Sequence, residues 1–285
     1  EMMTLARNLA SEQGMAIEAV VIGDNTQGLA EELKPQGVSA IHVVKHELLS
    51  DYAPSAWGKC INQLMESRAP EIVMAPGTER GNEVLAHVAA VENLPLAANC
   101  TEVIPGEPYR VTRTRWGGSL LEEAHLKGTP KLLTVTPHAF EPEESPNAQG
   151  DVAIEEFSPT LEAKDVAVRV VDRVKTVEAG ASLADAPVVI GGGRGVGGPE
   201  GFEVLESLGE LLNAPVGGSR VATNNGWRSH SDQIGLTGTK IAPNLYIACG
   251  ISGAVQHMVG CKGAKHIVVI NSDREAPILN KADYA

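Results

Sequence analysis

The stretch LYIACGISGAVQH, residues 245–257, combines the pattern of a buried strand with the start of a helix. Its first five residues are strand formers, two glycine breaks follow, and the helix formers after them end on Gln256 and His257. In α/β proteins such a junction holds phosphates, because the first turn of a helix has unpaired N–H groups and a positive dipole end. The glutamine and histidine predict an additional role beside phosphate binding.

A second junction of this kind is the glycine cluster GGGRGVGG at residues 191–198. It follows a strand-like run, and its glycines spell GxGxxG, the pattern of dinucleotide-binding loops. A site for NAD would carry an acid about 20 residues further on, and Ser219 and Arg220 stand there instead. Ordinary NAD binding is therefore disfavoured. Arg194 inside the cluster suits a pyrophosphate, although a turn arginine that faces solvent is the alternative.

Two more segments place polar residues after strand-like runs. The loop SDQIGLTGTKIAP, residues 231–243, contains Thr237, and Asn271 follows the run HIVVI. Each residue alone is typical of a turn or a cap. The carboxyl ends of parallel strands meet at one edge of a sheet, and ligands bind at that edge. The convergence of strand ends near 190, 218, 250 and 271 therefore predicts the binding site.

Strand-like and helical patterns alternate in both halves of the chain. Strand-like runs at 16–23, 40–44 and 71–76 have helical patterns between them, which predicts a parallel sheet with helices on its faces. Residues 97–140 contain three more strand-like runs. We therefore expect an α/β protein of two Rossmann-like domains with mainly parallel sheets.

The boundary between the domains is placed by composition. Residues 141–165 are acidic and rich in proline, which predicts a linker or a wrapped arm. A strand-like run at 166–171 follows, and a second α/β unit starts at 187. We expect an amino-terminal domain at 1–182, with this linker near its end, and a second domain at 183–285.

Composition excludes several classes of protein. The net charge of −13 argues against nucleic-acid binding, and no apolar run is long enough for a membrane helix. The four cysteines form no CxxC pair, which indicates free thiols in a reducing compartment and makes a metal site improbable. We expect a soluble cytoplasmic protein, or one of the mitochondrial matrix if the source is eukaryotic. Both ends of the chain look truncated, because a helix precedes the first strand and no closing helix follows ADYA.

The segments GISGAVQHMVG, VINSDREAPI and ADYA, together with GGGRG and GGSR, resemble the FAD-binding domain of the electron-transfer flavoprotein α subunit. The resemblance is dense over residues 183–285, and looser in the first domain around IVMAPGTERGNEVLAHVAA. It implies one bound FAD and a heterodimer with a β subunit that carries AMP, or a second FAD in electron-bifurcating versions. Such a carrier takes electrons from acyl-CoA dehydrogenases of fatty acid β-oxidation or from other dehydrogenases. It passes them to an acceptor such as a quinone oxidoreductase, with no substrate chemistry of its own.

The resemblance also implies site residues, none of them catalytic. Arg220 would lie against the isoalloxazine, Thr237 near its N5 edge, and His257 near N1 and the C2 carbonyl, where a positive charge would tune the redox potential. The whole expected cofactor-binding set is Arg194, Ser219, Arg220, Ile234, Gly235, Leu236, Thr237, Ser252, Gly253, Ala254, Val255, Gln256, His257 and Asn271.

Two departures from the family pattern concern the cofactor contacts. Many members have Gln-Thr-Gly-Lys where this chain has Leu-Thr-Gly-Thr at 236–239, so one polar contact is absent. The chain also stops short of a segment with an Asp-Leu pair that contacts the AMP half of FAD in the family.

Two other functions compete with an electron carrier. One is a flavin- or nicotinamide-dependent oxidoreductase with its own substrate, for which only His257 is a candidate acid or base. The other is a nucleotide-binding regulatory or scaffold protein without redox work. A flavin spectrum without turnover of small substrates would favour the carrier.

Overall fold

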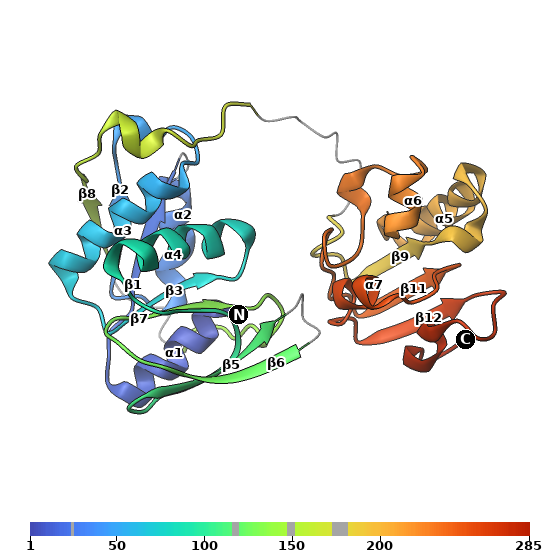
Figure 1. Cartoon of the computed structure of the whole chain (residues 1–285), viewed down its shortest axis with the longest axis horizontal. Coiled ribbons are helices and arrows are strands. Elements are labelled where there is room, and N and C mark those ends of the chain that lie inside the picture. The colour runs from blue at the N-terminus through green and yellow to red at the C-terminus, as the bar shows by residue number, and fades with distance from the viewer. Residues whose placement is uncertain (24–25, 116–119, 147–151, 173–181) are drawn as a thin grey trace. The chain divides into compact units, whose positions relative to one another are not determined.

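A computed structural model describes residues 1–23, 26–115, 120–146, 152–172 and 182–285. The chain forms two compact units, an amino-terminal unit of residues 1–115 and 121–173 and a carboxy-terminal unit that holds the rest (Figure 1). Both are α/β units with mainly parallel sheets, as predicted. The predicted boundary at 182/183 adjoins residues outside the described part and stays a prediction. Among the described residues no helix is long and apolar enough to cross a membrane.

The first sheet of the amino-terminal unit has three parallel strands in the order β1-β2-β8. They are β1 (Glu18–Ile22), β2 (Ala40–Val44) and β8 (Ala153–Phe157), with α2 (Thr26–Leu33) packed against them. All five residues of the central strand β2 are buried, as expected for a parallel strand with neighbours on both sides. Strand β8 lies inside the segment predicted as a linker or wrapped arm. That segment thus supplies an edge strand.

The second sheet of this unit has five strands in the order β3-β7-β4-β5-β6. Strands β3, β7 and β4 are parallel, while β4 and β5 are antiparallel. The helices α3 and α4 pack against each other, and α4 also contacts β3, β7 and β4. The bounds are α1 (Met2–Gln13), α3 (Pro54–Arg68), β3 (Ile72–Pro76), α4 (Glu79–Glu92), β4 (Leu96–Ile104), β5 (Tyr109–Arg115), β6 (Leu120–Leu126) and β7 (Lys131–Val135).

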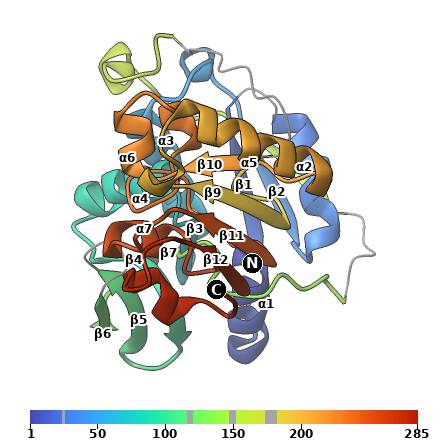
Figure 2. The same ribbon diagram turned by 90° about the vertical axis from the view of Figure 1, so that its right-hand side faces the viewer.

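The carboxy-terminal unit contains one parallel sheet of four strands in the order β10-β9-β11-β12 (Figure 2). The strands are β9 (Val188–Gly192), β10 (Val216–Gly218), β11 (Leu245–Cys249) and β12 (His266–Ile270). All four carboxyl ends therefore lie at the same edge of the sheet. This is the convergence that the sequence predicts.

Alternate residues of the strands pack against helices on opposite faces of the carboxy-terminal sheet. On one face Ile247 and Cys249 join a cluster with Phe202 and Leu205 of α5 (Pro199–Leu212) and with α6 (Arg220–Asn224). On the other face Tyr246 joins a cluster with residues near α7 (Val255–Gly260) and the 3₁₀ helix η7 (Pro277–Lys281). The period of two along β11 thus places Tyr246 on the same side of the sheet as α7.

The strand predicted at 166–171 is wrong. Residues 163–166 form a 3₁₀ helix, η4 (Ala163–Val166), and residues 167–172 form no strand. Val166 is buried in the core, but Val168 and Val171 are 66% and 89% exposed. A run of β-branched residues favours a strand only where a neighbouring strand and a core accept it.

Candidate functional site

The carboxyl edge of the β10-β9-β11-β12 sheet has a topological switch point between β9 and β11. From β9 the chain crosses to β10 on one side, and it later returns to β11 on the other side. The loops after β9 and β11 meet there, since the N–H of Gly195 donates to the carbonyl of Gly250 at 2.9 Å. In open α/β sheets ligands bind at such a point.

Glycine is required where these two loops meet. A Cβ on Gly193 would lie 2.3 Å from the carbonyl oxygen of Gly250, and one on Gly195 would lie 2.6 Å from the Cα of Gly250. Such distances are far below van der Waals contact, so the two backbones pack directly on each other. Two of the three glycines of the GxGxxG pattern, Gly193 and Gly195, therefore serve this loop contact, which accounts for them without an NAD site.

Two arginines stand at this edge without a side-chain partner. Arg194 begins the 3₁₀ helix η5 (Arg194–Val196) directly after β9, and Arg220 is the first residue of α6, directly after β10. Both are exposed, and among the described residues neither guanidinium forms an ion pair or hydrogen bond. Ser219 caps α6, its Oγ accepting a hydrogen bond from the N–H of Ala222 at 3.5 Å. Two unpaired cations on a chain of net charge −13 make this edge suitable for an anion.

The loop at 231–243 precedes β11 in the chain and forms hydrogen bonds with both the end of β10 and α7. The N–H of Ile234 donates to the carbonyl of Gly218 at 2.9 Å, and the N–H of Leu236 donates to the carbonyl of Gln256 at 2.7 Å. Ile234 is 1% exposed, and Gly235 passes close to the backbone of Gln256 with a φ of 153°. Residues 234–236 of the loop are thereby held between the end of β10 and the first turn of α7.

Thr237 lies exposed in this loop, and its hydroxyl accepts a hydrogen bond from a buried side chain. Gln233, which is 6% exposed, donates from Nε2 to Thr237 Oγ1 at 3.0 Å and accepts at Oε1 from Thr223 Oγ1 at 3.0 Å. Sequence reasoning missed Gln233, because nothing in its neighbourhood of the sequence marks it as buried.

The segment 252–256 presents its residues to solvent at the same edge. Ser252, Ala254, Val255 and Gln256 are exposed. Gly253 between them is buried, has a φ of 85°, and would place a Cβ 2.5 Å from the N–H nitrogen of Ile278. The glycine therefore lets the loop lie flat against η7, while its neighbours remain available to a ligand.

His257 has a different environment from the one predicted. It is 7% exposed, and its Nε2 lies 2.8 Å from Tyr246 Oη, while its Nδ1 is buried and has no hydrogen-bond partner among the described residues. Burial lowers the pKa of His257 to about 4, and an interaction with the backbone of Ile234 opposes that shift only in part. The imidazole is therefore neutral at neutral pH, and the predicted positive charge is wrong. Within the described part of the chain, no carboxylate acts on His257 to compensate the desolvation of a cation.

Asn271 uses its side chain to fix the loops. Its Nδ2 donates to the carbonyl of Ile251 at 2.8 Å, and its Oδ1 accepts from the N–H of Asp273 at 3.0 Å. The structure thus shows the capping role that its position after a strand suggested. One amide N–H remains for another acceptor.

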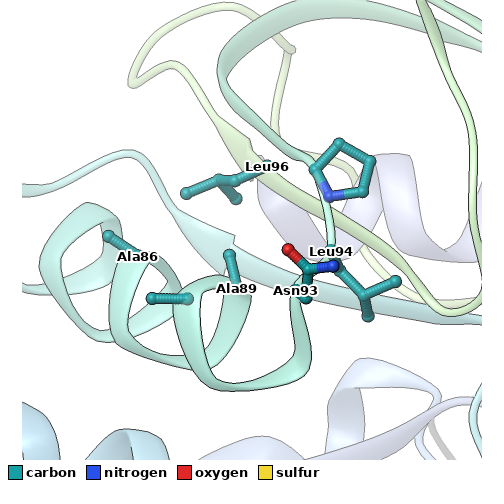
Figure 3. Close-up of a pocket in the computed structure, with 7 residues that line it drawn as sticks. Ala86, Ala89, Asn93, Leu94 and Leu96 are labelled. Atoms are coloured by element: carbon teal, nitrogen blue, oxygen red, sulfur yellow. The ribbon is translucent and has the colours of Figure 1, made fainter.

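The structure also contains cavities away from this edge. One, of about 480 Å³, lies at the turn between α4 and β4 and is lined by Ala86, Ala89, Ala90 and residues 93–96 (Figure 3). A second, of about 960 Å³, is lined mainly by apolar residues of α1, β1, α3 and β3. Both belong to the amino-terminal unit, and neither includes a predicted site residue. The predicted residues instead gather on the open edge of the other unit.

Comparison with known proteins assigns each unit to a family. Residues 182–262 match the family described as the electron transfer flavoprotein FAD-binding domain, and residues 1–162 match the electron transfer flavoprotein domain. An electron transfer flavoprotein subunit alpha from Thermoanaerobacterium thermosaccharolyticum is 32% identical over 287 residues, which cover 100% of this chain and 87% of the relative. A protein of the same name from Clostridium acetobutylicum is 34% identical, covering 100% and 86%. A protein FixB from Clostridium saccharobutylicum is 33% identical, covering 100% and 85%.

Proposed function

Because the chain belongs to the family of electron transfer flavoprotein α subunits, we propose that it carries electrons on one FAD bound at the carboxyl edge of its β10-β9-β11-β12 sheet. The electron-transfer role and the FAD-binding domain follow from that membership. The observation that supports the position of the cofactor is the meeting of the β9 and β11 loops at the switch point, with two unpaired arginines beside it.

The chemistry of this edge fits FAD. A dinucleotide needs cations and backbone N–H groups for its pyrophosphate, and hydrogen-bond partners of both kinds for its rings and ribityl chain. The edge offers the exposed guanidiniums of Arg194 and Arg220, and the exposed glycines Gly195 and Gly197 in the loop after β9. It also has a buried nitrogen without a partner, His257 Nδ1, to which a ligand could supply one.

Each part of the edge has a proposed contact. Arg194 would bind the pyrophosphate, while Arg220, Thr237 and His257 would surround the isoalloxazine. The remaining residues proposed to hold the cofactor are Ser219, Ile234, Gly235, Leu236, Ser252, Gly253, Ala254, Val255, Gln256 and Asn271. When bound, FAD supplies the capacity to accept and release electrons one or two at a time.

The protein's own residues set how readily the cofactor is reduced. The cation of Arg220 favours added negative charge on the flavin and so raises its potential. Thr237 contributes a hydroxyl that Gln233 holds in place. His257 contributes through hydrogen bonding and not through charge, because burial keeps its imidazole neutral.

We further propose a heterodimer with a β subunit that carries AMP, or a second FAD in an electron-bifurcating version. The electron donors would be acyl-CoA dehydrogenases of fatty acid β-oxidation or other dehydrogenases, and the acceptor a quinone oxidoreductase or its equivalent. An oxidoreductase with its own substrate is disfavoured, because its only candidate acid or base, His257, is buried and bonded to Tyr246. A carrier without substrate chemistry fits this arrangement better.

Purification with its β subunit tests the proposal. The complex should be yellow, release FAD and not FMN on denaturation, and turn over no small substrate unless a dehydrogenase is added. A complex that oxidises a small substrate on its own would overturn the carrier assignment. A second flavin on the β subunit would select the bifurcating alternative.

A further inference from the structure

Tyr246 is held in one position beside His257. It lies on β11 with 0% of its surface exposed, and its hydroxyl packs over Gly191 of β9, where a Cβ would lie 2.2 Å from Oη. Among the described residues the hydroxyl has a single hydrogen-bond partner, His257 Nε2 at 2.8 Å. The glycine therefore makes room for a phenol whose hydroxyl, within the described part of the chain, bonds to the imidazole alone.

The hydrogen-bonding needs of Tyr246 and His257 decide which imidazole nitrogen carries the proton. If Nε2 carried the imidazole proton and donated it, the Tyr246 O–H would have no acceptor and Nδ1 would have no donor, which leaves two buried groups unsatisfied. If Tyr246 donates to Nε2, the imidazole proton is on Nδ1. The interaction of the imidazole with the backbone of Ile234 does not reach hydrogen-bond geometry at Nδ1, so that N–H is the single group left without a full hydrogen bond. Each buried unsatisfied group is unfavourable. The Nδ1–H tautomer is therefore the stable one.

A doubly protonated imidazole does not change this conclusion. It would again leave the Tyr246 O–H without an acceptor. The other titratable groups that act on Tyr246 are the thiols of Cys249 and Cys261, whose pKa values burial raises. Both thiols are neutral at neutral pH, so no described residue supplies an anion that would stabilise a cation here.

We propose that Tyr246 is a positioning residue that fixes His257 as the Nδ1–H tautomer, so that His257 offers bound FAD a neutral hydrogen-bond donor. The inference rests on the proposed function, because the acceptor for Nδ1–H comes from the cofactor. It gives the tyrosine an indirect role in tuning the flavin, since a donor directed at an electron-rich acceptor stabilises the reduced cofactor. It also explains why the buried Nδ1 of His257 has no hydrogen-bond partner among the residues that the structure describes.

Nitrogen-15 NMR of the whole chain tests the tautomer without FAD. The His257 signals, assigned by their loss in His257→Asn, should show a neutral imidazole protonated at Nδ1. In Tyr246→Phe, which keeps the ring and removes the hydroxyl, the single tautomer should give way to a mixture. An Nε2–H tautomer in the unmodified chain, or an unchanged tautomer in Tyr246→Phe, overturns the proposal whether or not FAD binds.

The reduction potential of the bound flavin tests whether His257 donates a hydrogen bond to FAD. Tyr246→Phe should lower the potential when His257 is present, but should have no effect in the His257→Asn background, because an asparagine amide donates without help from a phenol. Equal shifts in both backgrounds would overturn the positioning role. Failure of every variant, and of the unmodified complex, to bind FAD would instead refute the proposed function. The unmodified chain's NMR spectrum would decide the tautomer even if Tyr246→Phe does not fold.

Discussion

Gln233 donates a hydrogen bond from its buried amide to the hydroxyl of the exposed Thr237, with 3.0 Å between Nε2 and Oγ1. The amide is itself oriented by Thr223, whose Oγ1 donates to Gln233 Oε1 at 3.0 Å. Because Thr237 accepts this bond, its own proton is free for an acceptor outside the loop. The buried glutamine thus prepares an exposed hydroxyl to donate.

Replacing Gln233 should destabilise the carboxy-terminal unit. Gln233→Leu removes both hydrogen bonds, while the Thr223 hydroxyl keeps the carbonyl of Arg220 as an acceptor at 3.1 Å. The free energy of unfolding should therefore fall by about 1–3 kcal/mol, the contribution of the two lost hydrogen bonds. Denaturant titration measures it. Thr237→Ser, which keeps the hydroxyl, is the matched control and should change little. A Gln233→Leu chain as stable as the control would show that the network contributes nothing.

The two arginines at the edge should separate into different roles. Arg194→Ala should weaken FAD retention and leave the potential of the bound cofactor nearly unchanged, because its proposed partner is the pyrophosphate. Arg220→Ala should lower the potential by about 60–130 mV, if its contact contributes roughly 1.5–3 kcal/mol. Potentiometric titration beside an occupancy measurement distinguishes them. Unshifted potential in Arg220→Ala at full occupancy would place the isoalloxazine elsewhere.

The contact between the β9 and β11 loops should not tolerate a side chain. Gly193→Ala places a Cβ 2.3 Å from a backbone oxygen of Gly250, so the loops must separate at a cost of about 3 kcal/mol or more. Gly197→Ala is the control, since its Cβ would meet nothing within 4 Å and only its φ of 88° is unfavourable, by about 1–2 kcal/mol. Denaturant titration should show a larger loss of stability, and FAD titration a larger loss of affinity, in Gly193→Ala than in Gly197→Ala. Equal losses would mean that close loop contact is not needed.

The buried imidazole of His257 should make stability depend on pH. Its pKa is lowered from 6.5 to about 4, so the unfolded chain binds more protons between these values, and stability should fall as pH falls from about 6.5 to 4. The contribution is about 3 kcal/mol at most. It should disappear in His257→Asn and persist in His266→Asn, where the histidine side chain is 68% exposed. The same slope in all three chains would contradict a buried neutral His257.

The parallel sheets were predictable from sequence because buried strands and amphipathic helices have distinct hydrophobic periods. The strands at 18–22, 40–44 and 72–76 fall within the runs predicted for them. Strand β8 was missed, because Ala153–Phe157 is an edge strand with two glutamates and a mostly exposed surface. An edge strand pairs through its backbone, and its side chains then give little signal.

The candidate site was predictable as a set of strand ends but not in its electrostatics. The positions of Arg194, Arg220 and Thr237 follow from the ends of strands that the sequence reveals. The environment of His257 does not, because its neutrality depends on Tyr246 and on burial beneath the loop at Ile234. The role of Gln233 likewise cannot be predicted from the sequence, because it depends on the contact between the 231–243 loop and α6. Contacts between segments distant in sequence decide such details.

FAD titration with amide hydrogen exchange tests the central claim most directly. The chain in complex with its β subunit is first depleted of flavin and then titrated with FAD, and exchange is compared with and without the cofactor. The account predicts one FAD per carboxy-terminal unit, and slower exchange at residues 193–197, 219–220, 234–237 and 252–257. Absence of FAD binding by this unit, or slower exchange confined to other segments, would contradict it.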